Sequence, residues 1–474
     1  MALLDQLLKH VEGQASSSGA IQVLDAFQTP LILYDPIRKL FHRSHEPRAL
    51  FADAKVGPLR PLLGARSRSP PSAAAARRRR SPPPAAPAAP QSKVQLYVDR
   101  FLLIQQRMRR NKMFRPPRWG ALGGGARAEA AELTELKALL GLVGQRRYVV
   151  GFLTRTGEGE FAIEDLSARL PLDLSAAETA HGLFTENCVV VAEGELTPGG
   201  AFRAAALGLP PAEARAESLA ALQGLDYFGG RRPDARAEAR WRAAAAEDRV
   251  VVLSDVWLDR PEVVDTLRTV LGGYAALEAP PSVFVLMGNF QSYDATAPTA
   301  RFAALRDAFA ALGRLIASFP ALRGRSRFVL VPGPGDAGGG GALPRAPLPR
   351  SLAGALLEAV PGAELASNPC RLRHGGAELV LFRGDVARRM RALALLPPGG
   401  GGAAPPEAPL FDQLCATVVQ EAHLCPLPLE YQPVVWEHDH ALYVYPMPHA
   451  LVMADAEPAA AHVYDTCACA NPVS

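Results

Sequence analysis

Several polar and aromatic residues directly follow apolar runs, at the positions where a parallel sheet would carry a ligand-binding or catalytic site. Asp255 ends one apolar run, Asn289 follows a second, and Asp336 lies just beyond a third. Carboxylate, amide and imidazole groups are the ligands with which a pair of divalent cations activates water and holds a phosphate. The carboxyl ends of parallel strands meet at one edge of a sheet. These positions, together with Trp257 and His423, therefore form a candidate centre for phosphoester hydrolysis.

The order of these residues resembles binuclear metallophosphoesterases of the calcineurin type, although most of the ligands are missing. That pattern reads Asp-x-His, Gly-Asp, Gly-Asn-His-Asp/Glu, a His and Gly-His-x-His along the chain. Here Trp257 stands where the first His is expected, Asn289 replaces the bridging Asp, and Asp336 follows Pro-Gly instead of an Asn-His pair. Because Asp255, Asp336 and His423 alone do not build a two-metal site, we interpret all five positions as vestigial. We expect no metal, no cofactor and no catalysis.

The elements that must position these residues alternate between strands and helices. The predicted strands are Arg249–Asp255, Ser282–Gly288, Ser326–Pro332, Glu378–Phe382 and Leu442–Tyr445. Helices are predicted over Pro261–Leu271 and Thr299–Phe319, between the first three strands. Continuous apolar strands alternating with helices indicate a sheet that is covered on both faces.

A small barrel is predicted before this region. Its five β-rich runs are Arg147–Arg155, Gly159–Asp165, Ala168–Leu174, Asn187–Thr197 and Ala201–Leu209. A helical stretch, Ala176–Leu183, lies between the third and fourth runs. Three strands, a helix and two strands is the order of an OB fold. The predicted fold class is therefore α/β with a β-barrel: an OB-fold barrel packed on an inactive calcineurin-like phosphoesterase domain, which is an α/β sandwich.

A helix with a basic stripe is predicted directly before the barrel. Its apolar face runs from Tyr97 to Met108 at helical spacing. Arg100, Arg107 and Arg110 lie beside that face. Basic residues interleaved with aromatics can track a phosphate backbone, whereas such a helix more often is solvated or docks on an acidic partner. We treat the three arginines as candidate contacts for nucleic acid or for a partner.

Composition divides the chain into four parts. Residues 1–60 form an N-terminal segment that is partly helical, and residues 61–92 form a disordered linker rich in Pro, Ala and Arg. The helix and the OB fold take up 93–215, and the phosphoesterase-like domain takes up 216–474. The run Arg77–Arg80 in the linker is either a nuclear import signal or a solvated basic stretch.

The bulk composition excludes several classes of protein. A net charge of +4 is too small to mark a general nucleic-acid binder. No apolar run approaches the length of a membrane span. The six cysteines lack the spacing of a disulfide framework, which favours a reducing compartment. We expect a soluble intracellular protein.

Two short motifs are weaker candidates for metal binding. Cys467 and Cys469 are one residue apart, but no second cysteine pair accompanies them. His438 and His440 flank Asp439, and in a strand both imidazoles would point to one face. Buried thiols and surface histidines are the more common outcome for such motifs.

Longer segments carry a closer resemblance, to the B subunits of DNA polymerase epsilon. In the C-terminal region they are Leu253–Arg260, Met287–Gln291, Phe328–Asp336, Leu343–Pro349, Ser367–Leu372, His423–Pro428 and Asp439–Asp455. Earlier segments are Leu24–Leu33, Phe161–Ser175 and Gly182–Gly194. The resemblance implies a non-catalytic accessory subunit in the nucleus that supports DNA replication and repair. Its implied partners are the zinc-containing C-terminal region of the catalytic subunit, the small histone-fold subunits and the replicative helicase assembly, with DNA contact indirect or weak and no membrane contact.

The resemblance also implies differences at both ends of the chain. Only Met1–Gln14 corresponds to the small helical domain with which the family usually begins. After Asn471-Pro472 the family continues into a final β segment, which we expect this chain to lack.

Two alternative functions of other classes follow from the residues themselves. A residual metallophosphoesterase would need ligands that the vestigial positions lack. An autonomous single-strand DNA-binding protein would need exposed aromatic side chains on the barrel. The candidates for that role are Tyr148, Phe152 and Phe161.

Overall fold

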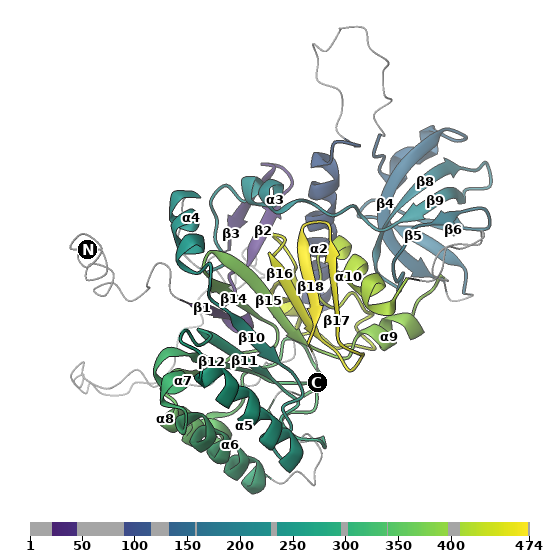
Figure 1. The fold of residues 1–474 in the computed structure, drawn as a ribbon. Helices are drawn as coiled ribbons and strands as arrows, with labels where there is room; N and C mark the ends of the chain where they lie inside the picture. Colours follow the sequence, from purple (N-terminus) through teal and green to yellow (C-terminus); the bar gives the residue numbers. More distant parts are fainter. Residues whose placement is uncertain are drawn as a thin grey trace, which may run out of the picture.

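The computed structural model describes residues 21–44, 90–114, 132–156, 159–228, 235–294, 302–338, 340–396 and 408–472. Met1–Gln14, residues 61–89 of the predicted linker and the Arg77–Arg80 run lie outside these ranges, whereas residues 90–92, which were also assigned to the linker, begin a helix. In the described part of the chain, no helix has both the length and the apolar character needed to cross a bilayer. Figure 1 shows a β-barrel beside a larger body built on two sheets, which confirms the predicted fold class.

The barrel is closed by five main strands and a short sixth. They are β4 (Arg146–Arg155), β5 (Phe161–Glu164), β6 (Arg169–Asp173), β7 (Glu178–Thr179), β8 (Val189–Leu196) and β9 (Phe202–Gly208). The strand order is β6-β5-β4-β8-β9-β7, and a parallel pairing of β6 with β9 closes the barrel. Alternate residues of β8 are buried because successive side chains point to opposite sides of a strand.

The helix predicted over Ala176–Leu183 is wrong. This stretch holds β7, whose Glu178 and Thr179 pair with Ala206 and Leu207 of β9. Pairing along β9 uses backbone groups that a helix would have bonded internally. A long-range contact thus overrides a local helical preference.

The body begins with a four-stranded parallel sheet and the helices that cover it. Its elements are β10 (Val250–Leu253), α5 (Pro261–Ala275), β11 (Val283–Met287), α6 (Phe302–Ala317), α7 (Pro320–Arg325), β12 (Arg327–Val331), α8 (Arg350–Ala359) and β13 (Ala363–Leu365). Phe284 and Leu286 pack among the residues of α5, α6 and α8. Val283 and Val285, on the opposite face of β11, pack against the second sheet. The sheet is therefore buried on both faces, as its unbroken apolar runs predicted.

The second sheet has the order β1-β14-β15-β16-β18-β17. Its strands are β1 (Gln22–Asp25), β14 (Cys370–His374), β15 (Ala377–Arg383), β16 (Ala450–Ala454), β17 (Ala460–Tyr464) and β18 (Cys467–Asn471). Further helices of the chain are α3 (Arg215–Ala221), α4 (Ala235–Ala244), α9 (Ala387–Ala392) and α10 (Leu410–Glu421). Strand β1 comes from the N-terminal segment, yet it pairs antiparallel with β14, where Asp25 lies opposite Cys370.

The strand predicted over Leu442–Tyr445 is also wrong. Leu442 ends the 3-10 helix η3 (Trp436–Leu442), and Tyr443 makes only an isolated bridge to His423. That bridge consists of the Leu424 N–H donating to the Leu442 carbonyl and the Val444 N–H donating to the Ala422 carbonyl, and the Tyr443 carbonyl accepts from the Arg371 guanidinium. His438 and His440 therefore lie on a helix and not on one face of a strand.

Helix α2 (Pro90–Arg110) joins the barrel to the body. In Figure 1 it lies between the barrel and the hairpin of β2 (Ile32–Asp35) and β3 (Leu40–Arg43). The Phe101 ring packs 5.6 Å from Phe152 of β4, centroid to centroid. The opposite side of the helix contacts η3 and β2. The apolar face that the sequence predicted from Tyr97 to Met108 is buried in this junction.

Candidate functional site

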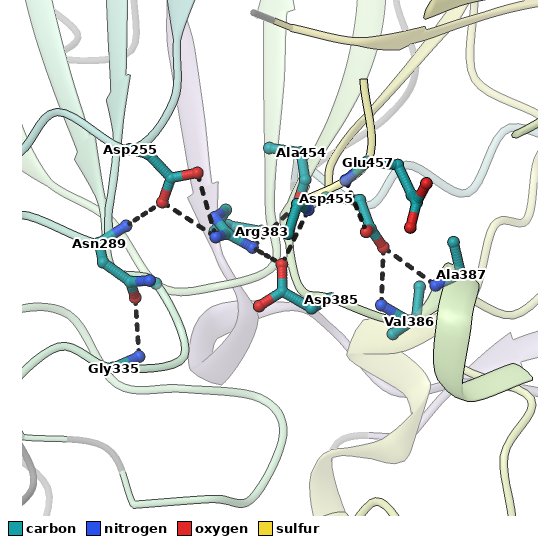
Figure 2. A network of polar contacts seen from close by, with 12 residues as sticks. Asp255, Asn289, Gly335, Arg383, Asp385, Val386, Ala387, Ala454, Asp455 and Glu457 are labelled. Atoms are coloured by element: carbon teal, nitrogen blue, oxygen red, sulfur yellow. Dashed lines mark hydrogen bonds and ion pairs between the residues drawn. The ribbon is translucent and has the colours of Figure 1, made fainter. Parts of the chain in front are cut away.

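The parallel sheet brings three of the five vestigial positions together. Because β10, β11 and β12 are parallel neighbours, the loops that follow them meet at one edge. The Asn289 backbone N–H donates to Asp255 Oδ1 at 3.1 Å, and Asn289 Oδ1 accepts the Gly335 backbone N–H at 2.7 Å. Figure 2 shows this chain of contacts. Asp336 joins it by accepting the Phe290 and Gly333 N–H groups at 2.8 and 2.7 Å.

An arginine that sequence reasoning missed lies at the centre of this site. Arg383 ends β15, and its guanidinium donates to both carboxylate oxygens of Asp255 at 2.9 and 3.2 Å. It also donates to the Gly288 carbonyl at 2.9 Å and to the Asp385 carboxylate. Its side chain is only 2% exposed. We call Asp255, Asn289, Asp336 and Arg383 the strand-end cluster.

The strand-end cluster has a single buried cation where a two-metal centre would have two. Burial alone would lower the pKa of Arg383, but Asp255 and Asp385 outweigh it and raise that pKa. The guanidinium is therefore charged and neutralises Asp255. An arginine that closes an apolar strand, as in the sequence LVLFR, was the one available signal of this role.

Both carboxylate oxygens of Asp336 accept hydrogen bonds from backbone N–H groups. Burial raises its pKa to about 6, and the hydrogen bonds from Gly333 and Phe290 act in the opposite direction. A Cβ on Gly288 would lie 1.8 Å from Asp336 Oδ2, so only glycine allows this close approach. Asp336 thus joins the loop after β11 to the loop after β12.

A further carboxylate, Asp455, secures the neighbouring loop. Its Oδ2 accepts the N–H groups of Val386 and Ala387 at 2.7 and 3.0 Å, at the start of α9. Figure 2 shows it beside Arg383 and Asp385. The carboxylates of Asp255, Asp336 and Asp455 are therefore all bonded to protein atoms.

These residues do not fit a pair of divalent cations. Asp255 is committed to Arg383, and both oxygens of Asp336 are committed to backbone donors. Across the described ranges, no group of three or more His, Cys, Asp or Glu side chains is arranged to hold a metal ion. A two-metal mechanism needs several such ligands with free oxygens, so no catalytic step follows from this geometry.

Trp257 and His423 do not complete the cluster. Trp257 contributes its backbone N–H to the Asp255 carbonyl at 2.8 Å, within the turn after β10. His423 lies elsewhere because α10 ends in a left-handed residue, Ala422, which redirects the chain. Its Nδ1 accepts the Cys425 N–H, so Nε2 carries the proton and donates to Asp439 Oδ1 at 3.2 Å. The expectation that His423 belongs to the strand-end site is corrected.

His423 belongs to a second buried cluster, with Arg100 and Asp439. The Arg100 Nε donates to Asp439 Oδ2 at 2.9 Å, and the two side chains are 11% and 3% exposed. Burial would raise the pKa of Asp439, but Arg100 and His423 hold it below its usual range. Because Arg100 lies on α2 and Asp439 on η3, this ion pair fixes α2 to the body. We call the three residues the helix-anchor cluster.

The arginine stripe of α2 faces inward, unlike the predicted contact with nucleic acid or a partner. Besides Arg100, the Arg107 guanidinium donates to the carbonyls of Gln420 and Pro211 at 3.0 and 2.7 Å. Arg110 donates to Glu213 Oε1 at 3.0 Å and to the Tyr445 hydroxyl at 3.2 Å. These guanidinium groups attach α2 to the rest of the protein, because the polar side of the helix packs against carbonyls and carboxylates of other segments.

The aromatic residues considered for strand binding on the barrel are largely covered. Tyr148 packs edge-on against Phe114, at 5.6 Å between centroids. Phe152 is 9% exposed beneath α2, and Phe161 lies under the Arg155 guanidinium. Base stacking needs open aromatic faces, which the covered side of β4 does not offer.

Comparison with known proteins decides the family. Residues 250–462 match the family model of the DNA polymerase alpha/epsilon B subunit, and residues 90–211 match the model of the DNA polymerase epsilon subunit 2-like OB-fold domain. The DNA polymerase epsilon B subunit of Arabidopsis thaliana is 34% identical over 98% of this chain and 80% of its own length. The chain belongs to the family of DNA polymerase epsilon B subunits.

Other members of the family are similar over most of their length. DNA polymerase epsilon subunit 2 of Homo sapiens is 34% identical over 81% of this chain and 72% of its own. The DNA polymerase epsilon B subunit of Schizosaccharomyces pombe is 29% identical over 95% and 72%. The range 250–462 contains the ends of β10, β11 and β12 as well as Arg383, so the strand-end cluster lies inside the B-subunit domain of the family.

Proposed function

We propose that this member of the B-subunit family is a non-catalytic accessory subunit of nuclear DNA polymerase epsilon, which supports chromosomal replication and repair. The names of its relatives support the assignment to that polymerase. The non-catalytic part rests on one observation, the buried guanidinium of Arg383 paired with Asp255. A positive side chain and a divalent cation compete for the same carboxylate.

Its proposed partner is the C-terminal region of the catalytic subunit. The small histone-fold subunits and the replicative helicase assembly are proposed as further members of the complex. DNA contact is proposed to be indirect or weak. The charges on the barrel surface favour this view, because Arg146 pairs with Glu193 and Arg203 with Asp173 and Glu195. Paired charges leave little net field to attract phosphates.

Co-expression tests the scaffold role. The chain is produced with and without the C-terminal region of the catalytic subunit from the same organism, and mass is measured by size-exclusion chromatography with light scattering. A stable one-to-one complex is expected. A chain that elutes alone at its monomer mass in the presence of the partner region would overturn the proposal.

A hydrolysis assay tests the non-catalytic part separately. The purified chain is incubated with Mn²⁺ and a phosphomonoester or phosphodiester, and an active calcineurin-type phosphatase serves as the positive control. No turnover above background is expected. Turnover that is abolished by Asp255→Asn would show that the strand-end cluster retains activity, whatever the outcome of the co-expression experiment.

A further inference from the structure

Helix α10 makes two of the contacts that hold the barrel on the body. Thr417 and Glu421 are four residues apart and therefore lie on the same face of this helix. The Thr417 hydroxyl accepts the Leu183 backbone N–H at 2.8 Å, and Glu421 Oε2 accepts the Val189 backbone N–H at 3.1 Å. Both donors belong to residues 183–189, which lead from β7 into the first residue of β8. We call residues 183–189 the docking segment.

The other hydrogen bonds between the docking segment and the body involve no ionisable side chain. The Thr185 hydroxyl donates to the Pro426 carbonyl at 2.6 Å, and the Leu395 N–H donates to the Phe184 carbonyl at 2.7 Å. Within the residues that the structure describes, Glu421 is thus the one ionisable side chain that hydrogen-bonds to this segment from the body.

The Glu421 carboxyl is buried with little to compensate a negative charge. Glu421 is 7% exposed, and in the described part of the chain its Oε1 has no hydrogen-bond partner. The charged or titratable groups that face it are Arg100 and Arg107 of α2 and the Cys188 thiol. Arg100 is paired with Asp439 and Arg107 donates to two backbone carbonyls, so neither guanidinium is bonded to Glu421. A charged carboxylate in this position is costly, whereas a protonated one is tolerated.

We propose that the contact between Glu421 and the barrel is a pH-sensitive switch. The carboxyl is protonated while the docking segment is in place, and its ionisation favours opening of the segment, because water then hydrates the charge. Burial raises the pKa of Glu421 from 4.5 to about 8, although the Val189 N–H and the two arginines of α2 act in the opposite direction. The docked state therefore binds the proton more tightly than the opened state.

Docking of the barrel is expected to weaken as the pH rises. The contribution of Glu421 is complete below pH 4.5 and is lost as pH rises to about 8, where the docked carboxyl also ionises. Opening releases one proton within this range, so the opening equilibrium constant should rise about tenfold per pH unit. The hydroxyls of Thr185 and Thr417 do not ionise here, so the dependence should disappear when Glu421 is replaced.

Hydrogen exchange of the full chain, followed by mass spectrometry, tests the proposal. Exchange rates of peptides that cover the docking segment are divided by the intrinsic rates at each pH. In the wild type, the corrected rate is expected to rise by on the order of 100-fold between about pH 5.5 and about pH 7.5. In Glu421→Gln, which keeps an acceptor for the Val189 N–H but does not ionise, the corrected rate is expected to stay constant.

Two control variants distinguish the switch from a purely structural contact. Thr417→Val removes the acceptor of the Leu183 N–H and should speed exchange of the docking segment by the same factor at every pH. Glu430→Gln replaces an exposed carboxylate and should leave the wild-type pH dependence unchanged. A corrected wild-type rate that does not vary with pH, or a pH dependence that persists in Glu421→Gln, would overturn the proposal. Because the wild-type profile can overturn it without any variant, poor folding of a variant does not prevent a decision.

Discussion

The strand-end cluster and the helix-anchor cluster are both built on a buried arginine–aspartate pair, but they join different parts of the chain. Arg383 and Asp255 hold together loops of one domain, at the edge where parallel strands end. Arg100 and Asp439 are 339 residues apart and connect α2 to the body. In both pairs a buried guanidinium neutralises a buried carboxylate.

The two clusters use the same chemistry for different purposes. In the strand-end cluster the Arg383 guanidinium bonds to the Gly288 carbonyl and to the Asp255 carboxylate, and so holds the loops after β10 and β11 together. In the helix-anchor cluster His423, whose residue type suggested metal binding, contacts Asp439 and so supports the ion pair that fixes α2. Residue type alone did not distinguish these roles.

Removing the strand-end cation is expected to have the largest effect. Arg383→Met leaves the Asp255 carboxylate buried without its cationic partner, which should lower the free energy of unfolding by about 3–5 kcal/mol. Urea unfolding followed by circular dichroism measures it. Arg388→Met is the matched control, because the Arg388 side chain is 77% exposed and its pair with Glu457 should contribute less than about 1 kcal/mol. Equal losses in the two variants would contradict the role of Arg383.

Breaking the helix anchor is expected to have a slightly smaller but more localised effect. Asp439→Ala leaves Arg100 buried and unpaired, with an expected loss of about 3 kcal/mol. Limited proteolysis should then cleave near α2 faster than in the wild type. Glu437→Ala, on the exposed side of the same η3 helix, serves as the control. If α2 remains as protected as in wild type, the anchor lies elsewhere.

The contributions of the two clusters to the free energy of unfolding are expected to change with pH in opposite directions. Burial raises the pKa of Asp336 to about 6 from 3.8, so the folded protein binds this proton more tightly than the unfolded chain. Its contribution is complete below about pH 4 and is lost as pH rises through 6, on the order of 3 kcal/mol. The pKa of Asp439 is lowered, so its contribution is present above about pH 4 and is lost as pH falls.

Unfolding free energies from pH 3 to 7 measure both effects. Relative to wild type, Asp336→Asn should lose the decline between pH 4 and 7, and Asp439→Asn should lose the decline at acid pH. Profiles of the two variants that run parallel to the wild type throughout would contradict the assigned shifts.

Restoring two of the missing metal ligands is expected to have the smallest effect, with no gain of metal binding. Trp257→His with Asn289→Asp rebuilds part of the metal pattern, yet Arg383 still occupies Asp255. We expect no Mn²⁺ binding by isothermal titration calorimetry. Binding by this double variant would show that the missing ligands, and not the guanidinium, exclude the metal.

Much of the framework was determined by the sequence itself. Unbroken apolar runs predicted β10, β11 and β12, because a strand covered on both faces has no polar side. The order of the runs also located Asp255, Asn289 and Asp336 at one edge, since parallel strands must end together. The five barrel strands followed from alternation and turn residues.

Only the tertiary structure decided which partners these residues have. The pairing of β7 with β9 replaced a predicted helix, and the turn at Ala422 moved His423 away from the strand ends. The arginines of α2 are buried because they bond to carboxylates and carbonyls that are distant in the sequence. The local sequence pattern determines whether a segment forms a helix or a strand. The partner of a buried charge depends instead on which distant segments of the chain meet, because a charge is stable inside a protein only beside an opposite charge or a hydrogen-bonding group.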